Sequence, residues 1–556
     1  MNKQFVFKSL VLIGLSMIGF DLHAQQKGEV QDQEFIIRKD RVLTLPVQPR
    51  SFERIPVLPT PKSNANFNYR VEPFFLPLPP LEIKPEAATK NFPRNLEELY
   101  PGFAKLGYGN YSSPLLQLRY NIWEDGDYNI GAKVSHEGFY TGPVGGKNSA
   151  ENHTHFGLDG TLFKDYFSLY GNVDYHRDEF NFYGYDPNNA LLSDYVTSNN
   201  VLNSFNIKAG ISNLEKMSDL NYDANLKIRL FNDRFSAVEN EVGLNGKFDF
   251  WFSESLKTEV LGNLSLTTPS DTTYRDINRN YFGIRPAVVY RKSGLYLKAG
   301  ANIIFENDVT DNKKSDFHVF PSIDASYMLS DEFGLYAGFE GDVQRKTYYD
   351  FVNENPFLGP SDALLNTIQN YLAKAGVKGS VNGEFNYEVG VAYGQFANMH
   401  YYNTNATDTL RFNLLYDSNT RVLNYHAKVN WEYQDWYKLS GGVNYYQYSL
   451  TDLEAAFHRP EWEITLGNTI KPLPKLLIQA NAHLLGGIVV SEPNPILDQT
   501  RTLPVILDLQ LKADYKITER FSVFAVGNNL LNQSNQRFLN YPVRGIQGVG
   551  GLTVKF

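Results

Sequence analysis

Long stretches in which apolar and polar residues strictly alternate constrain this chain more than any other feature. They begin near Phe103 and recur as far as the last residue, Phe556. From Leu507 to Lys516, for example, leucine, alanine and tyrosine alternate with charged and amide side chains. Successive side chains of a β-strand point to opposite faces, so each stretch predicts a strand with one apolar and one polar face. The stretches last about 9 to 14 residues, which suits a tilted crossing of a bilayer, whereas strands of soluble sheets average about 5 to 6.

Short polar turns and longer loops separate these stretches. The tight turns are Asn232-Asp233, Ser253-Glu254, Ser330-Asp331, Asn382-Gly383, Gln434-Asp435 and Thr518-Glu519. In membrane barrels the short turns lie on the periplasmic side and the long loops lie outside. Counting the stretches gives about 22 strands, within a range of about 20 to 24. We therefore predict an all-β membrane protein: a single large antiparallel transmembrane β-barrel over residues 102–556.

The composition agrees with a barrel and excludes other classes. The 36 Tyr and 38 Phe gather near the ends of the stretches, as at Phe250-Trp251-Phe252, which predicts aromatic girdles at the two membrane interfaces. A formal net charge of −9 gives no support to nucleic-acid binding. The chain has no cysteine, so no disulfide stabilises the fold.

The first 24 residues have the pattern of an export signal. Lys3 and Lys8 supply positive charge, residues 6–20 are mostly apolar, and Ala24 precedes the expected cleavage site. No cysteine follows the apolar segment, so a lipoprotein anchor is not expected. We therefore expect export to the outer membrane of a Gram-negative cell, with the lipid bilayer as the barrel's surroundings.

Residues 25–101 are rich in proline, as in Pro77-Leu78-Pro79-Pro80. Proline lacks the N–H donor that a central strand needs, so this segment is predicted to be extended. It lies either in the periplasm or in the barrel mouth, or it is a flexible linker. Phe74 and Phe75 are apolar residues within it. They are candidates for docking a periplasmic or outer-membrane protein partner.

The last strand is predicted to close the barrel. Leu552, Val554 and Phe556 fall on one face of an extended chain, and Thr553 and Lys555 fall on the other. A terminal strand of this kind would be an open edge in a soluble sheet, whereas in a barrel it pairs on both sides.

The same end of the chain carries a longer motif. It consists of Val526-Gly527-Asn528-Asn529-Leu530-Leu531-Asn532, Arg537-Phe538, Tyr541-Pro542, Gly545 and Gly551-Leu552-Thr553-Val554-Lys555-Phe556. Together these residues resemble the last two strands of a TonB-dependent receptor. The resemblance implies a 22-stranded barrel. It also implies that the terminal Phe556 pattern is recognised by the outer-membrane insertion machinery during biogenesis.

The N-terminal part departs from that family. TonB-dependent receptors carry a folded plug domain before the barrel, with a short energy-coupling box ahead of the plug. Only residues 25–101 are available here, and they are too short and too poor in alternating strands to form that plug. Arg41-Val42-Leu43-Thr44-Leu45 matches the coupling box only loosely. The resemblance is therefore to a receptor without its plug, and coupling to an energy source is not implied.

Two groups of residues are candidates for a transport site. On the polar faces of the strands the lumen candidates are Asp508, Gln510, Lys512, Asp514, Lys227 and Arg229. A ring of charged side chains in a pore governs which solutes pass. In the loop 355–362, Pro356, Phe357 and Leu358 are less polar than an exterior loop should be. They either fold inward as a constriction, or dock on a partner, or form a core within their own loop.

No pattern of chemistry for an enzyme is present. His153 and His155 share one face of a strand, and His136 and His176 lie on neighbouring stretches, so a cross-strand cluster is conceivable. No cysteine or diagnostic carboxylate spacing accompanies them. We therefore predict no metal site, no cofactor and no catalytic residues. The expected function is a solute channel or transport component; the alternative is a structural or accessory subunit of an outer-membrane assembly, secretion or uptake complex.

Overall fold

The computed structural model describes residues 100–184, 199–214, 219–273, 277–308, 315–361, 363–492 and 499–556. The chain divides into two compact units, and all of these residues belong to one of them. The other unit, Glu34–Leu99, lies outside the described residues. The predictions for the signal peptide, the proline-rich segment, Phe74 and Phe75 therefore fall outside the described residues as well.

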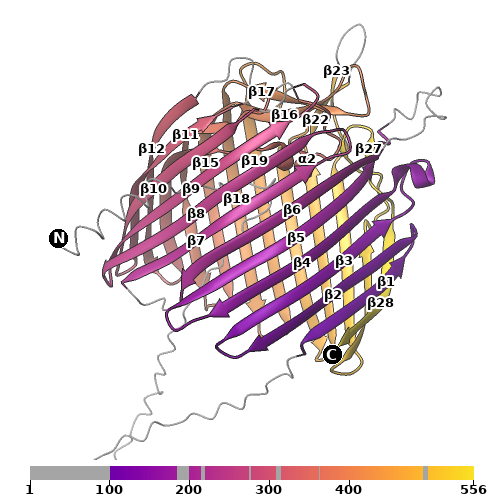
Figure 1. The fold of residues 1–556 in the computed structure, drawn as a ribbon, viewed down its shortest axis with the longest axis horizontal. Helices are drawn as coiled ribbons and strands as arrows, with labels where there is room; N and C mark the ends of the chain where they lie inside the picture. Colours follow the sequence, from indigo (N-terminus) through magenta and orange to yellow (C-terminus); the bar gives the residue numbers. More distant parts are fainter. Residues whose placement is uncertain are drawn as a thin grey trace, which may run out of the picture. The chain divides into compact units, whose positions relative to one another are not determined.

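The described residues form one closed antiparallel sheet of 22 strands (Figure 1). The first half consists of β1 (Gly102–Gly109), β2 (Ser113–Glu124), β3 (Tyr128–Phe139), β4 (Glu151–Phe163), β5 (Phe167–Asn181), β6 (Asn199–Asn213), β7 (Leu220–Asn232), β8 (Val238–Ser253), β9 (Leu256–Ser270), β10 (Arg279–Lys292) and β11 (Leu295–Asn307). The second half consists of β12 (Ser315–Ser330), β13 (Phe333–Gln344), β14 (Thr367–Val381), β15 (Phe385–Ala397), β18 (Thr420–Tyr433), β19 (Tyr437–Ser449), β20 (Trp462–Leu473), β21 (Leu476–Gly486), β24 (Ile506–Lys516), β25 (Phe521–Asn528) and β28 (Gln547–Lys555). The predicted strand number is confirmed.

The barrel closes where the first and last strands meet. β28 pairs antiparallel with β25 on one side and with β1 on the other. In this seam Leu552 lies opposite Leu106, and the ring of Phe556 stacks against Tyr120 with centroids 6.2 Å apart. The prediction that the last strand closes the barrel is confirmed, and the sheet has no open edge.

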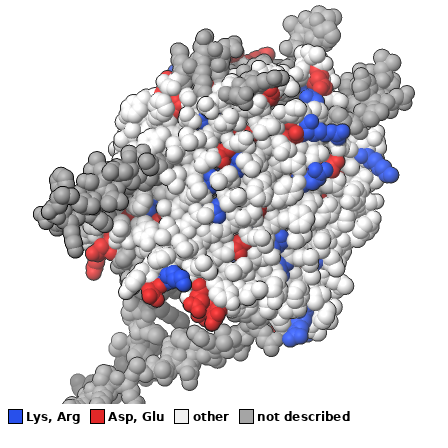
Figure 2. All heavy atoms as spheres, in the orientation of Figure 1, with Lys and Arg blue, Asp and Glu red and all other residues white. Residues whose placement is uncertain are grey.

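The outer wall of the barrel is apolar. On β24, Leu511 and Tyr515 are exposed on the outside, while Asp508 and Lys512 have the opposite parity and face the lumen. Figure 2 shows that most of the visible outer surface carries neither acidic nor basic side chains. Among the described residues, no helix is long and apolar enough to cross a membrane. The fold is that of a transmembrane β-barrel, as the alternation predicts.

Exposed aromatic side chains mark both ends of the outer wall. Tyr166, Phe252 and Trp436 are exposed at one end, and Tyr108 and Phe317 at the other. The rings of Tyr433 and Trp436 also contact each other, with centroids 5.9 Å apart. An amphipathic ring is stable at the interface between lipid and water, so this arrangement fits the predicted girdles.

The two ends of the barrel differ. The turn end carries the start of β1, the end of β28 and short connections such as 254–255 and 331–332. The loop end carries the longer connections, which gather at the top of Figure 1. These connections contain η1 (Gly146–Ser149), α2 (Tyr348–Glu354) and three small hairpins, β16 (Met399–Thr404) with β17 (Phe412–Asp417), β22 (Val489–Glu492) with β23 (Gln499–Thr502), and β26 (Gln536–Phe538) with β27 (Tyr541–Pro542).

One turn lies at the end opposite to the one expected. The tight connection at Asn232-Asp233 joins β7 to β8 at the loop end, so its assignment to the short-turn side was wrong. The Asp233 carboxylate accepts hydrogen bonds of 2.8 Å from the backbone N–H groups of Phe235 and Ala237. This local pairing keeps the connection short, although its neighbours at the loop end are long.

Candidate functional site

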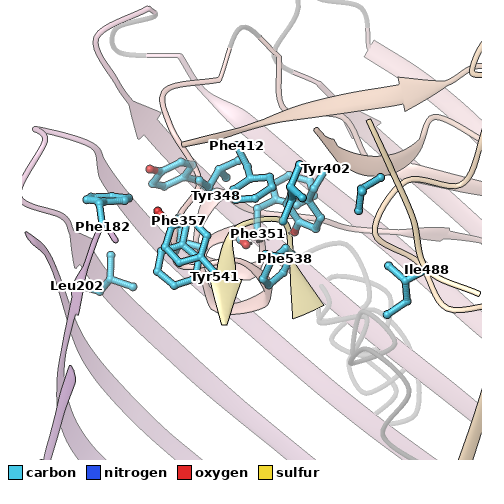
Figure 3. Close-up of a cluster of buried hydrophobic side chains, with 14 of the residues drawn as sticks. Phe182, Leu202, Tyr348, Phe351, Phe357, Tyr402, Phe412, Ile488, Phe538 and Tyr541 are labelled. Atoms are coloured by element: carbon cyan, nitrogen blue, oxygen red, sulfur yellow. Dashed lines mark hydrogen bonds between the residues drawn. The ribbon is translucent and has the colours of Figure 1, made fainter. Parts of the chain in front are cut away.

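The loops at the loop end fold inward and meet in one apolar cluster (Figure 3). We call it the lumen cluster; its buried members are Phe182, Leu202, Phe231, Ala237, Tyr348, Phe351, Val352, Phe357, Leu358, Leu364, Tyr402, Phe412, Leu485, Ile488, Val490, Leu503, Ile506, Phe538, Leu539 and Tyr541. Leu202 belongs to β6 and Ile506 to β24, which are well separated around the barrel. Side chains from distant parts of the wall thus join one cluster, which spans the lumen at this end.

Phe357 lies in the middle of the lumen cluster. Its ring stacks on that of Tyr541 with centroids 3.6 Å apart, and it meets Phe182 and Phe538 edge-on. Phe357 is 8% exposed and Leu358 is 2% exposed, while Pro356 is half-buried. These residues therefore point inward and pack against other loops, which is the geometry that a constriction requires.

A group of buried charges, which we call the loop clamp, attaches α2 to the barrel wall. The Arg345 guanidinium, just after β13, lies 2.5 Å from the Glu241 carboxylate on β8. Arg229 on β7 pairs with both Glu241 and Glu239, the latter at 3.3 Å. Glu239 also accepts hydrogen bonds from the first two N–H groups of α2, those of Tyr348 and Tyr349. Charges removed from water are tolerated only when paired, so these contacts fix the position of the loop.

A second contact holds the far end of the same loop. Arg279 on β10 donates hydrogen bonds to the Lys346 carbonyl and to the Asn366 side chain. It also lies 3.3 Å from the Asp308 carboxylate, which accepts the Asn366 N–H at 2.9 Å. The loop is thus attached to the wall at both of its ends.

Beside the lumen cluster lies a cavity of about 540 Å³, a size suited to a small-molecule ligand. Leu485 and Ile506 belong to both the cluster and the cavity lining. The charged lining residues are Lys346, Arg459, Arg537, Arg544, Glu354, Glu463 and Asp508. His400 also lines it, and burial lowers the pKa of this histidine to about 4. At neutral pH the imidazole is therefore uncharged.

The predicted lumen residues are only partly brought together. Asp508 lines the cavity, and its carboxylate accepts hydrogen bonds from the Asn529 N–H at 3.0 Å and from Gln510 at 3.1 Å. Lys512 and Asp514 lie on the same face of β24, nearer the turn end. Lys227 and Arg229 face the lumen from β7, on a distant part of the wall, and Arg229 belongs to the loop clamp. The six candidates therefore do not form one ring.

The histidines lie on both faces of the barrel. His153, His155 and His176 face the lumen, whereas His136 lies on the outer face and bonds to Thr154 at 2.8 Å, so His136 does not join a cluster with them. His155 and His176 stack at 4.0 Å, and with Asp174 they offer ligand atoms within 4.8 Å of one another. The Lys133 ammonium lies 2.9 Å from the Asp174 carboxylate, so this carboxylate already has a cationic partner. Glu306, Asp316 and His318 form a second group with this spacing.

Sequence reasoning identified Arg229 as a lumen residue but missed the other members of the loop clamp and most of the cavity lining. Arg345 and Glu241 are 104 positions apart in the sequence, and no local pattern relates them. Arg537 and Tyr541 were noted only as parts of the terminal motif. The one available signal was the alternation along β8, which places Glu239 and Glu241 on its lumen face.

Comparisons with known proteins show which solved structures have a similar fold. No family model and no curated protein matches the sequence. Among solved structures, the FrpB iron transporter from Neisseria meningitidis is similar with a TM-score of 0.66 and 11% identity, over 83% of this chain and 82% of that one. The pyoverdine outer membrane receptor FpvA from Pseudomonas aeruginosa has a TM-score of 0.62 and 12% identity, over 82% and 78% of the two chains.

A third similar structure is the ferric-catecholate import receptor Fiu from E. coli, with a TM-score of 0.60 and 10% identity, over 82% of both chains. At such identities the likeness concerns the fold. The resemblance to TonB-dependent receptors inferred from the sequence is confirmed at that level.

Proposed function

We propose that this protein is a transport barrel of the outer membrane, which takes a solute through a lumen that its own loops close. The observation that carries the proposal is the lumen cluster together with the charged cavity beside it. A barrel that served only as a wall would need neither a gate held by buried ion pairs nor a hollow of ligand size behind it. The solved proteins with this fold, which are named an iron transporter, an outer membrane receptor and an import receptor, support the same class of function.

Conductance across a planar bilayer tests the proposal. Four forms are compared: the mature chain, a deletion of residues 25–93, Arg345→Met in the loop clamp, and the deletion combined with Arg345→Met. We expect the combined form to conduct most, because it lacks the proline-rich segment and has lost the ion pair that holds the loop. If no form conducts, the lumen stays filled and the transport proposal fails.

The alternative of an accessory subunit depends on the proline-rich segment. Replacing Phe74 and Phe75 by serine removes its two adjacent aromatic anchors. If the segment docks an outer-membrane or periplasmic protein, this change releases the partner from the complex isolated with the barrel. An unchanged complex together with unchanged transport would count against the accessory function.

A further inference from the structure

Three of the four cations that line the cavity lack a carboxylate partner among the described residues. Of Lys346, Arg459, Arg537 and Arg544, only Arg544 lies within 4.0 Å of a carboxylate, that of Glu151 at 2.8 Å. The Arg459 guanidinium instead donates to the His400 carbonyl oxygen at 2.8 Å. The Nη1 group of Arg537 is buried and has no hydrogen-bond partner within the described part of the chain. Lys346 is 6% exposed.

The three carboxylates of the same cavity contact groups other than these cations. Glu354 pairs with His400 at 3.0 Å, and Glu463 pairs with His483 at 2.8 Å. The Asp508 carboxylate accepts the Asn529 N–H and the Gln510 side chain. Among the described residues, Lys346, Arg459 and Arg537 therefore have no carboxylate within 4.0 Å, and Glu354 acts on all three only from a longer distance.

Burial makes this arrangement unfavourable while the cavity holds only water. It lowers the pKa of both Lys346 and Arg537, which is the response of a cation that is removed from solvent and insufficiently paired. The pKa of Arg459 is raised instead: burial opposes the charged form there, but Glu354 and nearby tyrosines favour it more strongly. An anion in the cavity would place a carboxylate or phosphate oxygen in direct contact with these cations, which the carboxylates of the lining do not do. Guanidinium groups hold carboxylate and phosphate oxygens with particularly good geometry.

We propose that the cavity binds a small organic anion that carries a carboxylate or phosphate group, held by Lys346, Arg459 and Arg537. Phe396, Leu485 and Tyr448 line the same cavity and give the ligand an apolar or ring-shaped body to contact. This anion would be the solute that the barrel transports. That step rests on the proposed transport function, whereas binding of the anion does not.

Calorimetric titration of the full mature chain in detergent tests the binding step. Glucose 6-phosphate and glucose form a matched pair of probes that differ only in the phosphate, and citrate tests a carboxylate. We expect both anions to bind at low salt and more weakly at high salt, and we expect glucose not to bind. Glucose binding as tightly as its phosphate would overturn the proposal.

Substitutions locate the binding. Arg537→Gln and Lys346→Met should each weaken anion binding by about ten- to a hundredfold, the range for losing one charge-assisted contact. Arg537→Lys keeps the charge and should lose less. The control is Arg501→Gln on β23, an arginine that pairs with Glu492 outside the cavity lining. Unchanged affinity in both cavity variants, or an equal loss in the control, would overturn the proposal.

Folding and transport are followed separately. The shift in gel mobility on heating reports whether each variant is a folded barrel. If Arg537→Gln does not fold, the anion affinities of Lys346→Met and Arg537→Lys test the proposal in its place. Anion binding without flux into liposomes would refute the transport function and leave the binding site standing. Flux of neutral glucose with no anion binding would refute the anion site and leave the transport function standing.

Discussion

Glu241 is the residue on which the closed state of the loop end depends most directly. It is 1% exposed and lies between two guanidinium groups, those of Arg229 and Arg345. One arginine comes from the wall and the other from the loop that carries α2. A carboxylate in this position joins two elements that have no covalent connection nearby, and its removal would leave two buried cations facing each other.

The first prediction concerns Glu241→Gln. The amide cannot neutralise Arg229 and Arg345. We therefore expect the free energy with which the loop clamp stabilises the closed loop to fall by about 3 to 5 kcal/mol, the usual cost of breaking a buried ion pair by removing one partner. Protease cleavage within residues 345–361 and bilayer conductance should both increase.

Glu432→Gln is the matched control for this change. Glu432 pairs with Lys438 at 2.8 Å at the turn end, with both side chains more than half exposed. Such surface pairs contribute about 0 to 1 kcal/mol, so neither cleavage nor conductance should change. Equal behaviour of the two variants would contradict the role given to the loop clamp.

At this scale the sequence predicts the face of a residue and not its partners. Strand parity correctly places Arg229 and Asp508 on the lumen side, because the side-chain period of a strand is local. It could not separate Arg229, which is locked in ion pairs, from Asp508, which lines the cavity. That difference depends on Arg345, which follows β13 and reaches Arg229's partner Glu241 from a part of the sequence that alternation does not relate to β7 or β8.

Among the elements, the β16–β17 hairpin has a buried titratable group at its base. His400 on β16 is 3% exposed and contacts Glu354 of α2 and the Arg459 guanidinium. Burial is the largest cause that lowers its pKa to about 4, with Arg459 and Lys346 adding to the effect and Glu354 opposing it. The neutral imidazole is therefore the form that this packing accommodates.

The second prediction is that acid weakens the packing of this hairpin. The unfolded histidine takes up its proton near pH 6.5 and the folded one only near pH 4, so the free energy of unfolding falls as the pH drops through this window. The loss reaches about 3 kcal/mol at its lower end. The hydrogen-exchange protection factors of residues 399–404, which correct for the intrinsic slowing of exchange in acid, should fall between pH 7 and pH 4.5.

The variant His400→Gln should remove this acid response, since an amide does not titrate in the window. His483→Gln, which alters a more exposed histidine of the same cavity, should leave the response intact. An acid response that persists fully in His400→Gln would show that another group causes it.

The third prediction concerns the loop that carries Phe357. Phe357→Ala removes a ring that contacts five other aromatic residues and leaves a hole at the centre of the lumen cluster. A buried phenylalanine to alanine change costs about 3 to 5 kcal/mol, so the cluster should loosen and conductance should rise. Phe317→Ala, on the lipid-facing wall, should leave conductance unchanged.

For the whole molecule, the sequence predicts the barrel well and its closed end poorly. The strand count, the antiparallel order and the closing strand follow from alternation and turn spacing, which any window of the sequence displays. The inward packing of six connections involves residues such as Phe182, Phe357 and Tyr541, which are 175 or more positions apart in the sequence. The sequence shows that these residues are apolar, but it does not show which of them contact one another.

The last prediction tests how the barrel sits in the bilayer through two neighbouring residues of the closing strand. Leu552 points outward, is 56% exposed and lies opposite Leu106 in the β1–β28 seam, whereas Thr553 has the opposite parity. A lysine on the lipid face costs about 2 to 4 kcal/mol near the bilayer midplane, while lumen-facing lysines remain in water. Leu552→Lys should therefore lower the yield of heat-modifiable barrel in lipid vesicles, and Thr553→Lys should not.

Equal losses in the two variants would mean that the seam tolerates neither change and that the membrane does not distinguish the two faces of β28. A loss confined to Thr553→Lys would reverse the assignment of outside and inside, because alternation allows only these two registers of the wall.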